Sequence, residues 1–322
     1  MSQLKTPPSA VPRGENSANL GGIAEASVPI PWSVAIASRL ADYLELTKPR
    51  ISVMVLISVS VGFALASEGS VQFPLLAHAL FGIALVAAGS SALNQFLERE
   101  SDGLMPRTAT RPLPSGRLLP IEVLGFGVTA GLLGFSYLAS FVNLATALLS
   151  GLTLLVYVFL YTPLKRTSPL CTALGAVPGA LPPVLGWTAA GGEWGAGALC
   201  LFGILYLWQF PHFLAIAWLY REQYAKAGLK MLPSARPGVT GFLAAGYALA
   251  LLPISLLPSR SGLAGEAYFL AALILGVGYL FCAASFMRQE SQKTARRLLW
   301  SSLVYLPVLL FVLTWDHFRL LQ

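Results

Sequence analysis

Long apolar stretches dominate the chain from about residue 51 onward, and short polar connections separate them. Most reach the roughly 20 residues that a helix needs to cross a bilayer. The fifth contains Pro178, Pro182 and Pro183, which predicts a bent or broken span because proline removes a helical hydrogen bond. The stretches cover residues 51–67, 74–97, 120–139, 142–161, 170–190, 196–218, 239–258, 264–287 and 298–318. The pattern predicts an all-α integral membrane protein, a bundle of about nine transmembrane helices.

The first 42 residues differ from the rest of the chain. They are rich in Ser, Pro, Gly and Ala and contain few large apolar residues. Such a segment buries too little apolar surface to fold, and it lacks the compact apolar run of a secretory signal peptide. We therefore expect a disordered tail over 1–42 and one polytopic membrane domain over 43–322.

Composition supports the membrane class, since 56% of the residues are hydrophobic and only 11% are charged. Soluble domains carry about 25% charged residues. Cys171, Cys200 and Cys282 lie far apart in apolar stretches, so neither a disulfide framework nor a thiolate metal site is indicated. The net charge of +7 arises from basic residues placed between spans. Membrane orientation explains that placement better than nucleic-acid binding does.

The basic residues favour one class of loop. Of the 21 Lys and Arg residues, only Arg260 and Arg319 fall in connections of the other class. Positive residues accumulate in cytoplasmic loops. We therefore expect the amino terminus in the cytoplasm and the carboxyl terminus outside, which agrees with an odd number of spans.

The stretch from Asn94 to Arg117 places three acids and four arginines at the end of an apolar segment. Asn94, Glu98 and Asp102 are four residues apart, so on a helix they share one face. A column of oxygens suits a hard cation, and Mg²⁺ usually takes only one or two carboxylates from the protein. Glu100 points away on a regular helix and becomes a ligand only if the helix unwinds there.

Three arginines follow the acids, Arg107, Arg111 and Arg117. Their planar guanidinium groups match phosphate oxygens in a bidentate manner. A solvated loop that only orients the protein would need positive charge but not the acids. The combination therefore favours a magnesium-bound phosphate compound.

Other loops on the same side add candidate residues, each with a second interpretation. Lys165 and Arg166 either pair with a leaving diphosphate or mark the cytoplasmic side. His212 is either a packing residue or a substrate contact. Arg221 and Tyr224 either bind substrate or belong to an interfacial belt. Lys48 and Arg50 are interpreted as membrane anchors. We expect these loops to form a cytoplasm-facing cavity that holds the charged head of an amphiphile whose hydrocarbon tail runs between helices.

These residues resemble a known family. Over about residues 43 to 318, the chain is similar to the membrane prenyltransferases related to 4-hydroxybenzoate polyprenyltransferase, and within them to the protohaem IX farnesyltransferases. The acid column is shared by the superfamily, whereas RPLPSGR, WQFPHF and AGLKMLP are typical of the haem branch. The matching segments are LTKPRI (46–51), NxxxExExD (94–102), MPRTATRPLPSGR (105–117), YTPLKR (161–166), GALPPVLGW (179–187), WQFPHF (208–213) and YAKAGLKMLP (224–233).

The resemblance implies transfer of a farnesyl group from farnesyl diphosphate to a vinyl group of haem B with addition of water. The products would be haem O and diphosphate, a step toward haem A and the cytochrome oxidase cofactor. It implies Mg²⁺ as cofactor, haem B as substrate and no nucleic-acid partner. It also implies membrane lipid around the protein, a haem A synthase or oxidase assembly factor as a further partner, and the bacterial cytoplasmic membrane rather than the mitochondrial inner membrane.

Roles follow for the candidate residues. Expected catalytic residues are Asn94, Glu98, Asp102, Arg107 and Lys165. Expected contacts to diphosphate or haem are Arg111, Arg117, Arg166, His212, Arg221 and Tyr224. Expected metal ligands are Asn94, Glu98, Glu100 and Asp102.

The chain departs from the family at two places. Gln223, beside Glu222, stands where the family usually has Asp, which weighs against a second Mg²⁺ site built from protein carboxylates. Glu98 and Glu100 replace the Asp of many relatives, and glutamate still binds Mg²⁺.

Two other functions fit the first motif, a prenyltransferase for another aromatic acceptor such as a quinone precursor and a transporter of an anionic solute.

Overall fold

Helices make up all the regular secondary structure in the part of the chain that the computed structural model describes, residues 32–67, 69–231 and 236–322. Contacts divide the chain into two units, Met1–Ser38 and Arg39–Gln322, and the predicted spans lie in the second. The helices are α1 (Trp32–Leu46), α2 (Pro49–Ala66), α3 (Phe73–Gly103), α4 (Pro120–Phe141), α5 (Leu144–Leu155), the π-helix η1 (Val156–Tyr161), α6 (Thr162–Leu164), α7 (Cys171–Ala180), α8 (Pro182–Ala189), α9 (Ala196–Leu219), α10 (Arg221–Lys226), α11 (Val239–Arg260), α12 (Glu266–Arg288) and α13 (Gln292–Leu321).

Helix α1 begins at Trp32, so the prediction of a disordered tail is wrong for residues 32–42. The rest of that predicted tail, residues 1–31, lies outside the described residues. Within α1, Asp42 is buried and forms an ion pair with Arg117, 75 residues further along the chain. Composition reports only on the segment itself. It therefore suggested disorder, because it does not reveal a stabilising partner so distant in the chain.

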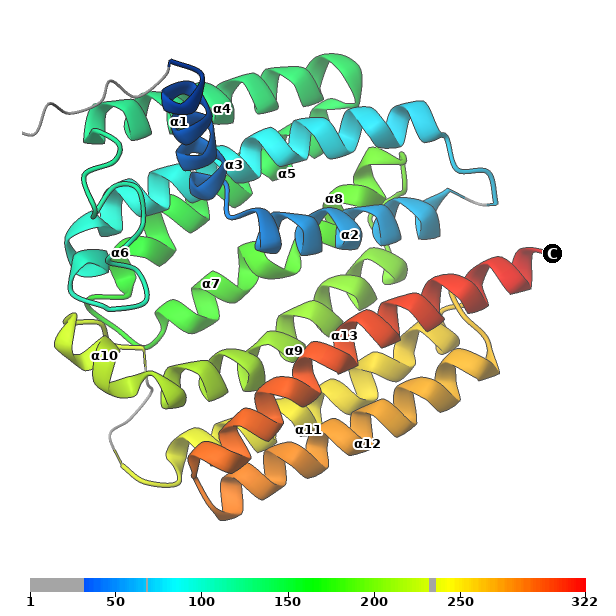
Figure 1. Ribbon diagram of the computed structural model, residues 1–322. Coiled ribbons are helices and arrows are strands. Elements are labelled where there is room, and N and C mark those ends of the chain that lie inside the picture. Colours follow the sequence, from blue (N-terminus) through cyan, green and yellow to red (C-terminus); the bar gives the residue numbers. More distant parts are fainter. Residues whose placement is uncertain (1–31, 68, 232–235) are drawn as a thin grey trace, which may run out of the picture. The chain divides into compact units, whose positions relative to one another are not determined.

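Eight helical segments among the described residues are long and apolar enough to cross a membrane, with α5, η1 and α6 forming one segment, Leu144–Leu164. The fifth of the nine predicted spans is instead a pair of short helices, α7 with 10 residues and α8 with 8. The break lies at Leu181, directly before Pro182, the first residue of α8, as the prolines predicted. The helical membrane fold is confirmed with eight candidate spans among the described residues, and α7 and α8 follow one another where a ninth was predicted (Figure 1).

The broken pair is held by very close packing against α2. A Cβ atom on Gly62 of α2 would lie 1.8 Å from the Pro183 carbonyl oxygen, and one on Gly186 of α8 would lie 1.9 Å from the Val59 carbonyl oxygen. Only glycine permits backbones to approach so closely, as small residues do at helix contacts in membranes. The GALPPVLGW segment therefore has a packing role.

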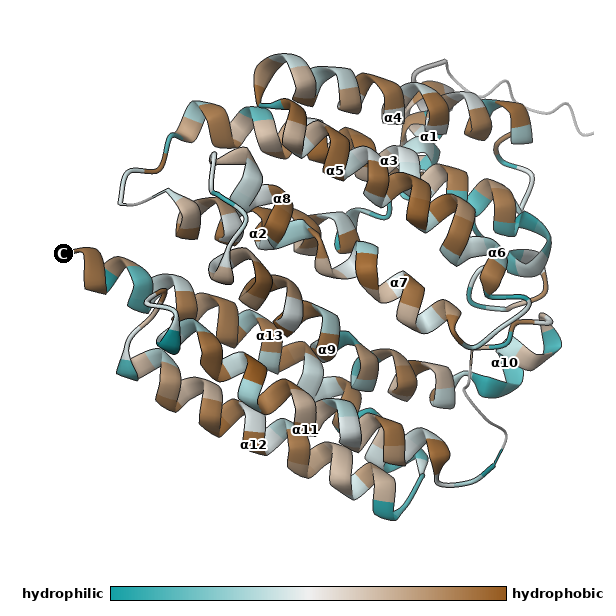
Figure 2. Ribbon diagram, turned by 180° about the vertical axis from the view of Figure 1, so that it is seen from behind, coloured by the Kyte–Doolittle hydropathy of each residue, from teal (hydrophilic) through white to brown (hydrophobic). Residues whose placement is uncertain are grey.

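The helices of the second unit lie side by side, with α7 and α8 between two groups (Figure 1). One group contains α2 to α5, and the other contains α9 and α11 to α13. Helix α9 is the most enclosed span, with half of its apolar window buried. Hydrophobic residues cover the lengths of the helices and hydrophilic residues gather toward their ends (Figure 2), as expected for a surface in contact with lipid.

Helix α3 is unusually long, and this length positions the candidate site. It has 31 residues and therefore spans about 46 Å, against about 30 Å for the hydrocarbon core of a bilayer. Asn94, Glu98 and Asp102 occupy its last turns, at the end of the bundle where α10 also lies (Figure 1). The polar column is thus at one end of the bundle and not at its middle.

Candidate functional site

The oxygen column predicted on α3 lines a cavity. Asn94, Glu98 and Asp102 are buried, with 1%, 8% and 2% of their surface exposed. All three line a cavity of about 240 Å³. Helix α3 continues to Gly103 without unwinding, so the spacing of four residues keeps the three side chains on one face.

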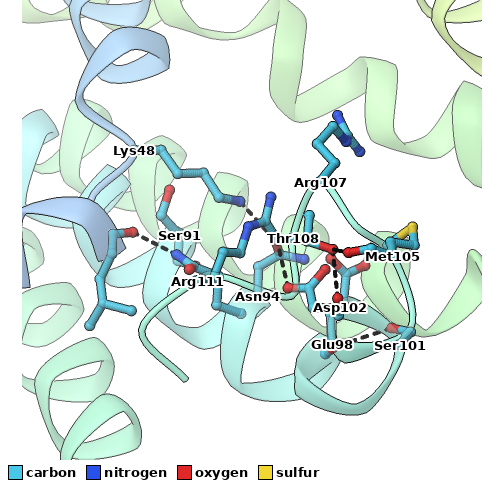
Figure 3. Close-up of polar contacts among 12 residues, drawn as sticks. Lys48, Ser91, Asn94, Glu98, Ser101, Asp102, Met105, Arg107, Thr108 and Arg111 are labelled. Carbon is cyan, nitrogen blue, oxygen red and sulfur yellow. Dashed lines mark hydrogen bonds and ion pairs between the residues drawn. The ribbon is translucent and has the colours of Figure 1, made fainter. Parts of the chain in front are cut away.

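Lys48 contacts the first member of the column. Its ammonium donates to Asn94 Oδ1 at 3.0 Å (Figure 3), and the Asn94 amide nitrogen donates to Thr162 Oγ1 at 3.0 Å. Lys48 has φ of 50°, the only positive φ at a residue other than glycine in the described chain. A left-handed conformation typically costs about 1–3 kcal/mol, and such strain gathers at functional sites. The interpretation of Lys48 as a membrane anchor missed this contact.

Glu98, the second member, is paired with Lys165. The ammonium donates to Glu98 Oε1 at 2.7 Å, and the two side chains are only 12% and 11% exposed. Burial alone would lower the pKa of Lys165, but the neighbouring Tyr161 and Glu98 side chains outweigh it and raise that pKa above its ordinary value. The amine is therefore a fixed cation beside the column.

Asp102, the third member, is paired with Arg111. The guanidinium donates to Asp102 Oδ2 at 2.6 Å (Figure 3), and the aspartate side chain is 3% exposed. Thr108 Oγ1 donates to the Asp102 main-chain carbonyl at 2.7 Å. The loop after α3 therefore folds back onto the end of its own helix and delivers Arg111 to the cavity.

A π-helical turn brings further groups to the cavity wall. It covers Val156–Tyr161, and Tyr157 and Tyr161 both line the cavity. The Lys165 ammonium lies 4.4 Å from the centre of the Tyr161 ring, a favourable cation–π contact. Single π-helical turns are frequent at functional sites. The extra residue of such a turn has no signature in the hydrophobic pattern, so the sequence did not predict it.

The second long loop closes the cavity from α10. Arg107 Nη2 donates to the Tyr224 hydroxyl at 3.3 Å, and the Arg107 guanidinium lies 5.2 Å from the centre of the Tyr220 ring. The Lys230 main-chain amide donates to the Lys165 carbonyl at 2.8 Å. These contacts join loops more than 60 residues apart, so the structure brings Arg107, Lys165 and Tyr224 to one place, as predicted.

Apolar side chains form another part of the cavity wall. They come from α9 and from the segment after α10, next to the charged column. The residues are Phe213, Ile216, Ala217, Leu229 and Met231. A cavity with charges at one side and hydrocarbon at the other suits an amphiphile with an anionic head.

Five predicted residues are not among those that line the cavity, and three of these are Glu100, Arg166 and Arg221. The Glu100 side chain is 74% exposed and has a weak ion pair with Arg99 at 3.7 Å, so α3 does not unwind to deliver it. Arg166 is exposed on the loop after α6. The Arg221 guanidinium lies over the Trp218 ring, 4.2 Å from its centre, which fits the interfacial belt.

Two further candidates have partners elsewhere. Arg117 donates to Asp42 and to Glu45 Oε2, the latter at 2.8 Å, and so fastens the loop to α1. His212 Nδ1 lies 2.7 Å from the Ser302 hydroxyl of α13, and neither residue lines the cavity. The structure therefore places Arg117 and His212 in packing contacts.

The donor set fits magnesium in type. It offers one amide oxygen and two carboxylates, and Mg²⁺ prefers oxygen ligands, of which the protein usually supplies few. No group of three His, Cys, Asp or Glu residues is gathered closely enough to hold a metal in the described part of the chain. One oxygen of each column side chain instead has a cation as partner. A metal that bound these three oxygens would replace Lys48, Lys165 and Arg111 there.

Known proteins are similar to this chain in sequence. The chain is 42% identical over 289 residues to the protoheme IX farnesyltransferase of Solibacter usitatus, covering 86% of this chain and 99% of the relative. It is 45% identical over 311 residues to the protoheme IX farnesyltransferase of Koribacter versatilis, covering 90% of this chain and 97% of the relative.

Solved structures share the fold. A digeranylgeranylglyceryl phosphate synthase superposes with a TM-score of 0.75 at 18% identity, covering 87% of this chain and 99% of that one. A UbiA homologue from Archaeoglobus fulgidus bound to GPP and Mg²⁺ gives a TM-score of 0.63 at 17% identity, covering 85% and 99%. The model of the UbiA prenyltransferase family matches residues 55–317. The chain therefore belongs to the UbiA prenyltransferase family and is an integral membrane prenyltransferase.

Proposed function

We propose that the protein transfers a farnesyl group from farnesyl diphosphate to a vinyl group of haem B, with addition of water, to give haem O and diphosphate. The observation that carries the proposal is the buried column of Asn94, Glu98 and Asp102, paired with three cations beside an apolar wall. The names of the two relatives supply the acceptor and the prenyl length. The reaction fits a step toward haem A.

Asn94, Glu98 and Asp102 would hold Mg²⁺, which the Archaeoglobus fulgidus homologue binds together with GPP. When bound, the metal neutralises charge on the diphosphate and so makes it a better leaving group. Glu100 stays outside this set because its side chain points into solvent.

Lys48, Lys165 and Arg111 would exchange partners as the diphosphate binds. Each now contacts one oxygen of the column. Each would release that oxygen to the metal and donate to a phosphate oxygen instead, which stabilises the charge that develops on the leaving group. Arg107, held by Tyr224 and Tyr220, would support the same charge from the other loop.

The chemistry divides between the two sides of the cavity. The allylic C–O bond of farnesyl diphosphate breaks at the charged side, and both bonding electrons leave with diphosphate. The vinyl carbon of haem then bonds to the farnesyl carbon, and water adds to the resulting cation as a proton leaves. Phe213, Ile216 and Ala217 exclude other water from the first cation. The cavity of about 240 Å³ is below the usual size of a small-molecule site, so the helices or loops must separate to admit both substrates.

The alternative acceptor is another aromatic compound such as a quinone precursor. The column and its cations serve both acceptors equally, so the distinction rests on the relatives. Anion transport is less well supported, because transporter sites lie near the bilayer midplane and these charges lie at one end of the bundle (Figure 1).

An acceptor assay tests the proposal. The purified protein in lipid receives farnesyl diphosphate and Mg²⁺ with either haem B or 4-hydroxybenzoate, and products are identified by mass. We expect haem O from the first mixture and no prenylated product from the second. Prenylated 4-hydroxybenzoate without haem O would contradict the haem assignment and support the alternative.

The proposal extends to orientation and partners. The basic loops support an orientation with the candidate site and the amino terminus in the cytoplasm of a bacterium and Gln322 outside. The test is a reporter enzyme that is active only outside the cytoplasm, fused after Gln322. We expect this reporter to be active. Because the farnesyl chain of haem O keeps it in the membrane, a haem A synthase or an oxidase assembly factor in the same membrane would receive it, and purification with chemical cross-linking tests this partner.

A further inference from the structure

A second cavity lies on the surface of the bundle, between α12 and α13. It is a groove of about 570 Å³ that shares no residue with the candidate site. Its walls are almost entirely apolar along the two helices. The lining residues are Ile274, Leu275, Gly278 and Tyr279 of α12 and Arg297, Trp300, Ser301, Val304 and Tyr305 of α13.

The groove faces outward and is open along its length. Ile274, Trp300 and Val304 are 62%, 68% and 56% exposed, as expected for side chains that contact lipid. Gly278 leaves the space free, because a Cβ atom there would meet nothing within 4 Å. A larger residue at 278 would therefore fill the groove without disturbing the backbone.

A basic segment lies at one end of the groove. Arg288, Lys293, Arg296 and Arg297 fall between the last residue of α12 and the second turn of α13, and all four are exposed. None takes part in an ion pair with a described residue, although ion pairs occur elsewhere on the protein. The nearby acid Glu290 accepts from the Gly241 main-chain amide at 2.7 Å. The segment thus presents four cations and one acid, and Arg297 also lines the groove itself.

The geometry points to a binding site for one anionic phospholipid in the leaflet next to the candidate site. The acyl chain would lie in the groove between α12 and α13, and the head group would lie against Arg297 and the neighbouring cations. The loop between α12 and α13 is at the same end of the bundle as α10 (Figure 1). Clusters of four or more basic residues beside a membrane helix attract anionic lipids. Tryptophan side chains such as Trp300 are common at the level of the lipid head groups.

Charge decides the class of lipid. A zwitterionic head group brings its own cation toward Arg288, Lys293, Arg296 and Arg297, whereas phosphatidylglycerol or cardiolipin brings only negative charge. A second copy of this chain is the main competing occupant, but two copies meeting at this groove would bring two such basic segments together. The chemistry therefore favours lipid.

The test is competition for the groove in mixed bilayers. The full chain is purified in nanodiscs of equal phosphatidylglycerol and phosphatidylcholine, released into mild detergent, and its retained lipid is counted by native mass spectrometry. We expect phosphatidylglycerol to be retained at least about fivefold over phosphatidylcholine. Equal retention of the two lipids by the wild-type protein would overturn the proposal.

Four variants separate the parts of the site. R296Q/R297Q should lose most of the preference for phosphatidylglycerol, and R296K/R297K should keep it. G278L should reduce retention of both lipids, since it fills the groove. K226Q, which removes an exposed cation of α10 at the same end of the bundle, should retain lipid like the wild type. If K226Q reduces the preference as much as R296Q/R297Q does, the effect is one of net charge and the site does not exist.

Oligomeric state completes the test. We expect the same mass distribution for the wild type and for G278L. Dimers that G278L dissociates would instead identify the groove as a contact between two copies and would refute the lipid assignment.

Discussion

The Lys165 ammonium lies 2.7 Å from the Glu98 carboxylate, although the two residues are 67 positions apart. Lys165 follows α6 and Glu98 lies near the end of α3, so the pair joins two segments at the cavity. Both side chains are nearly buried. A buried pair of this kind is poor evidence for stabilisation, because desolvation offsets the attraction. Its position at a polar cavity favours a functional role.

Replacing Lys165 by Met should lower kcat about 10²–10³-fold, the usual effect of removing one group that stabilises developing charge. K165R should recover part of this loss because it restores the cation. Steady-state formation of haem O measures the effect, and circular dichroism checks that each variant is folded. Full activity in folded K165M would show that this cation does not assist the leaving group.

Glu98 and Glu100 form a matched pair two residues apart on α3, one facing the cavity and one facing solvent. E98Q should lower turnover strongly and raise the Mg²⁺ concentration needed for the half-maximal rate, because a carboxylate ligand is lost. E100Q should retain activity within about twofold, as expected of an exposed substitution. The rates are compared across a Mg²⁺ titration. A large loss in E100Q with an active E98Q would reverse the assignment of ligands.

Lys48 and Arg50 provide a similar comparison at the start of α2. K48Q should raise KM for farnesyl diphosphate about tenfold or more, because a charge-assisted hydrogen bond to phosphate is worth about 1.5–3 kcal/mol. R50Q, on an exposed side chain without a described contact, should leave KM unchanged. Initial rates over a range of farnesyl diphosphate provide the measurement. Equal effects in the two variants would return Lys48 to the role of a membrane anchor.

Arg117 should contribute to stability and not to substrate binding. R117Q removes its contacts to Asp42 and Glu45. Because Arg117 is 40% exposed, we expect a loss of about 1 kcal/mol and a decrease in Tm of about 2–4 °C, with KM unchanged. Thermal unfolding in detergent and the KM for farnesyl diphosphate are measured together. An unchanged Tm with a raised KM would restore Arg117 as a phosphate contact.

His212 should behave as a packing residue. Its ring stacks on that of Trp208, with 5.1 Å between centres and 23° between planes, and its Nδ1 contacts Ser302. H212N should lower Tm while binding of haem B, followed by its absorption spectrum, stays unchanged. A shifted haem spectrum in folded H212N would indicate a direct contact with haem.

The sequence predicted the membrane class, the broken fifth span and the column on α3, because each depends on local spacing or on proline chemistry. The spacing of Asn94, Glu98 and Asp102 needs only a regular helix, and α3 is regular there. Lys165, Arg111 and Tyr224 were also predicted, because charged and polar residues are scarce outside the ends of these spans, and all three line the cavity.

Features that depend on distant partners were missed or misplaced. The helix over residues 32–42 is tied to Arg117 through Asp42, and Arg117 itself was expected at the phosphate. The role of Lys48 depends on a left-handed conformation before Pro49, which hydrophobic patterning does not encode. A signal was nevertheless present, since a Lys–Pro pair at the start of a membrane helix places a cation at its first turn.

Release of diphosphate by the purified protein, with and without divalent cations, tests the magnesium assignment. After exhaustive chelation we expect no diphosphate from farnesyl diphosphate and haem B, and we expect full recovery when Mg²⁺ is added back. The variant lacking both Glu98 and Asp102 should stay inactive at every Mg²⁺ concentration. Undiminished release after chelation, or wild-type release by that variant, would contradict a metal site on α3.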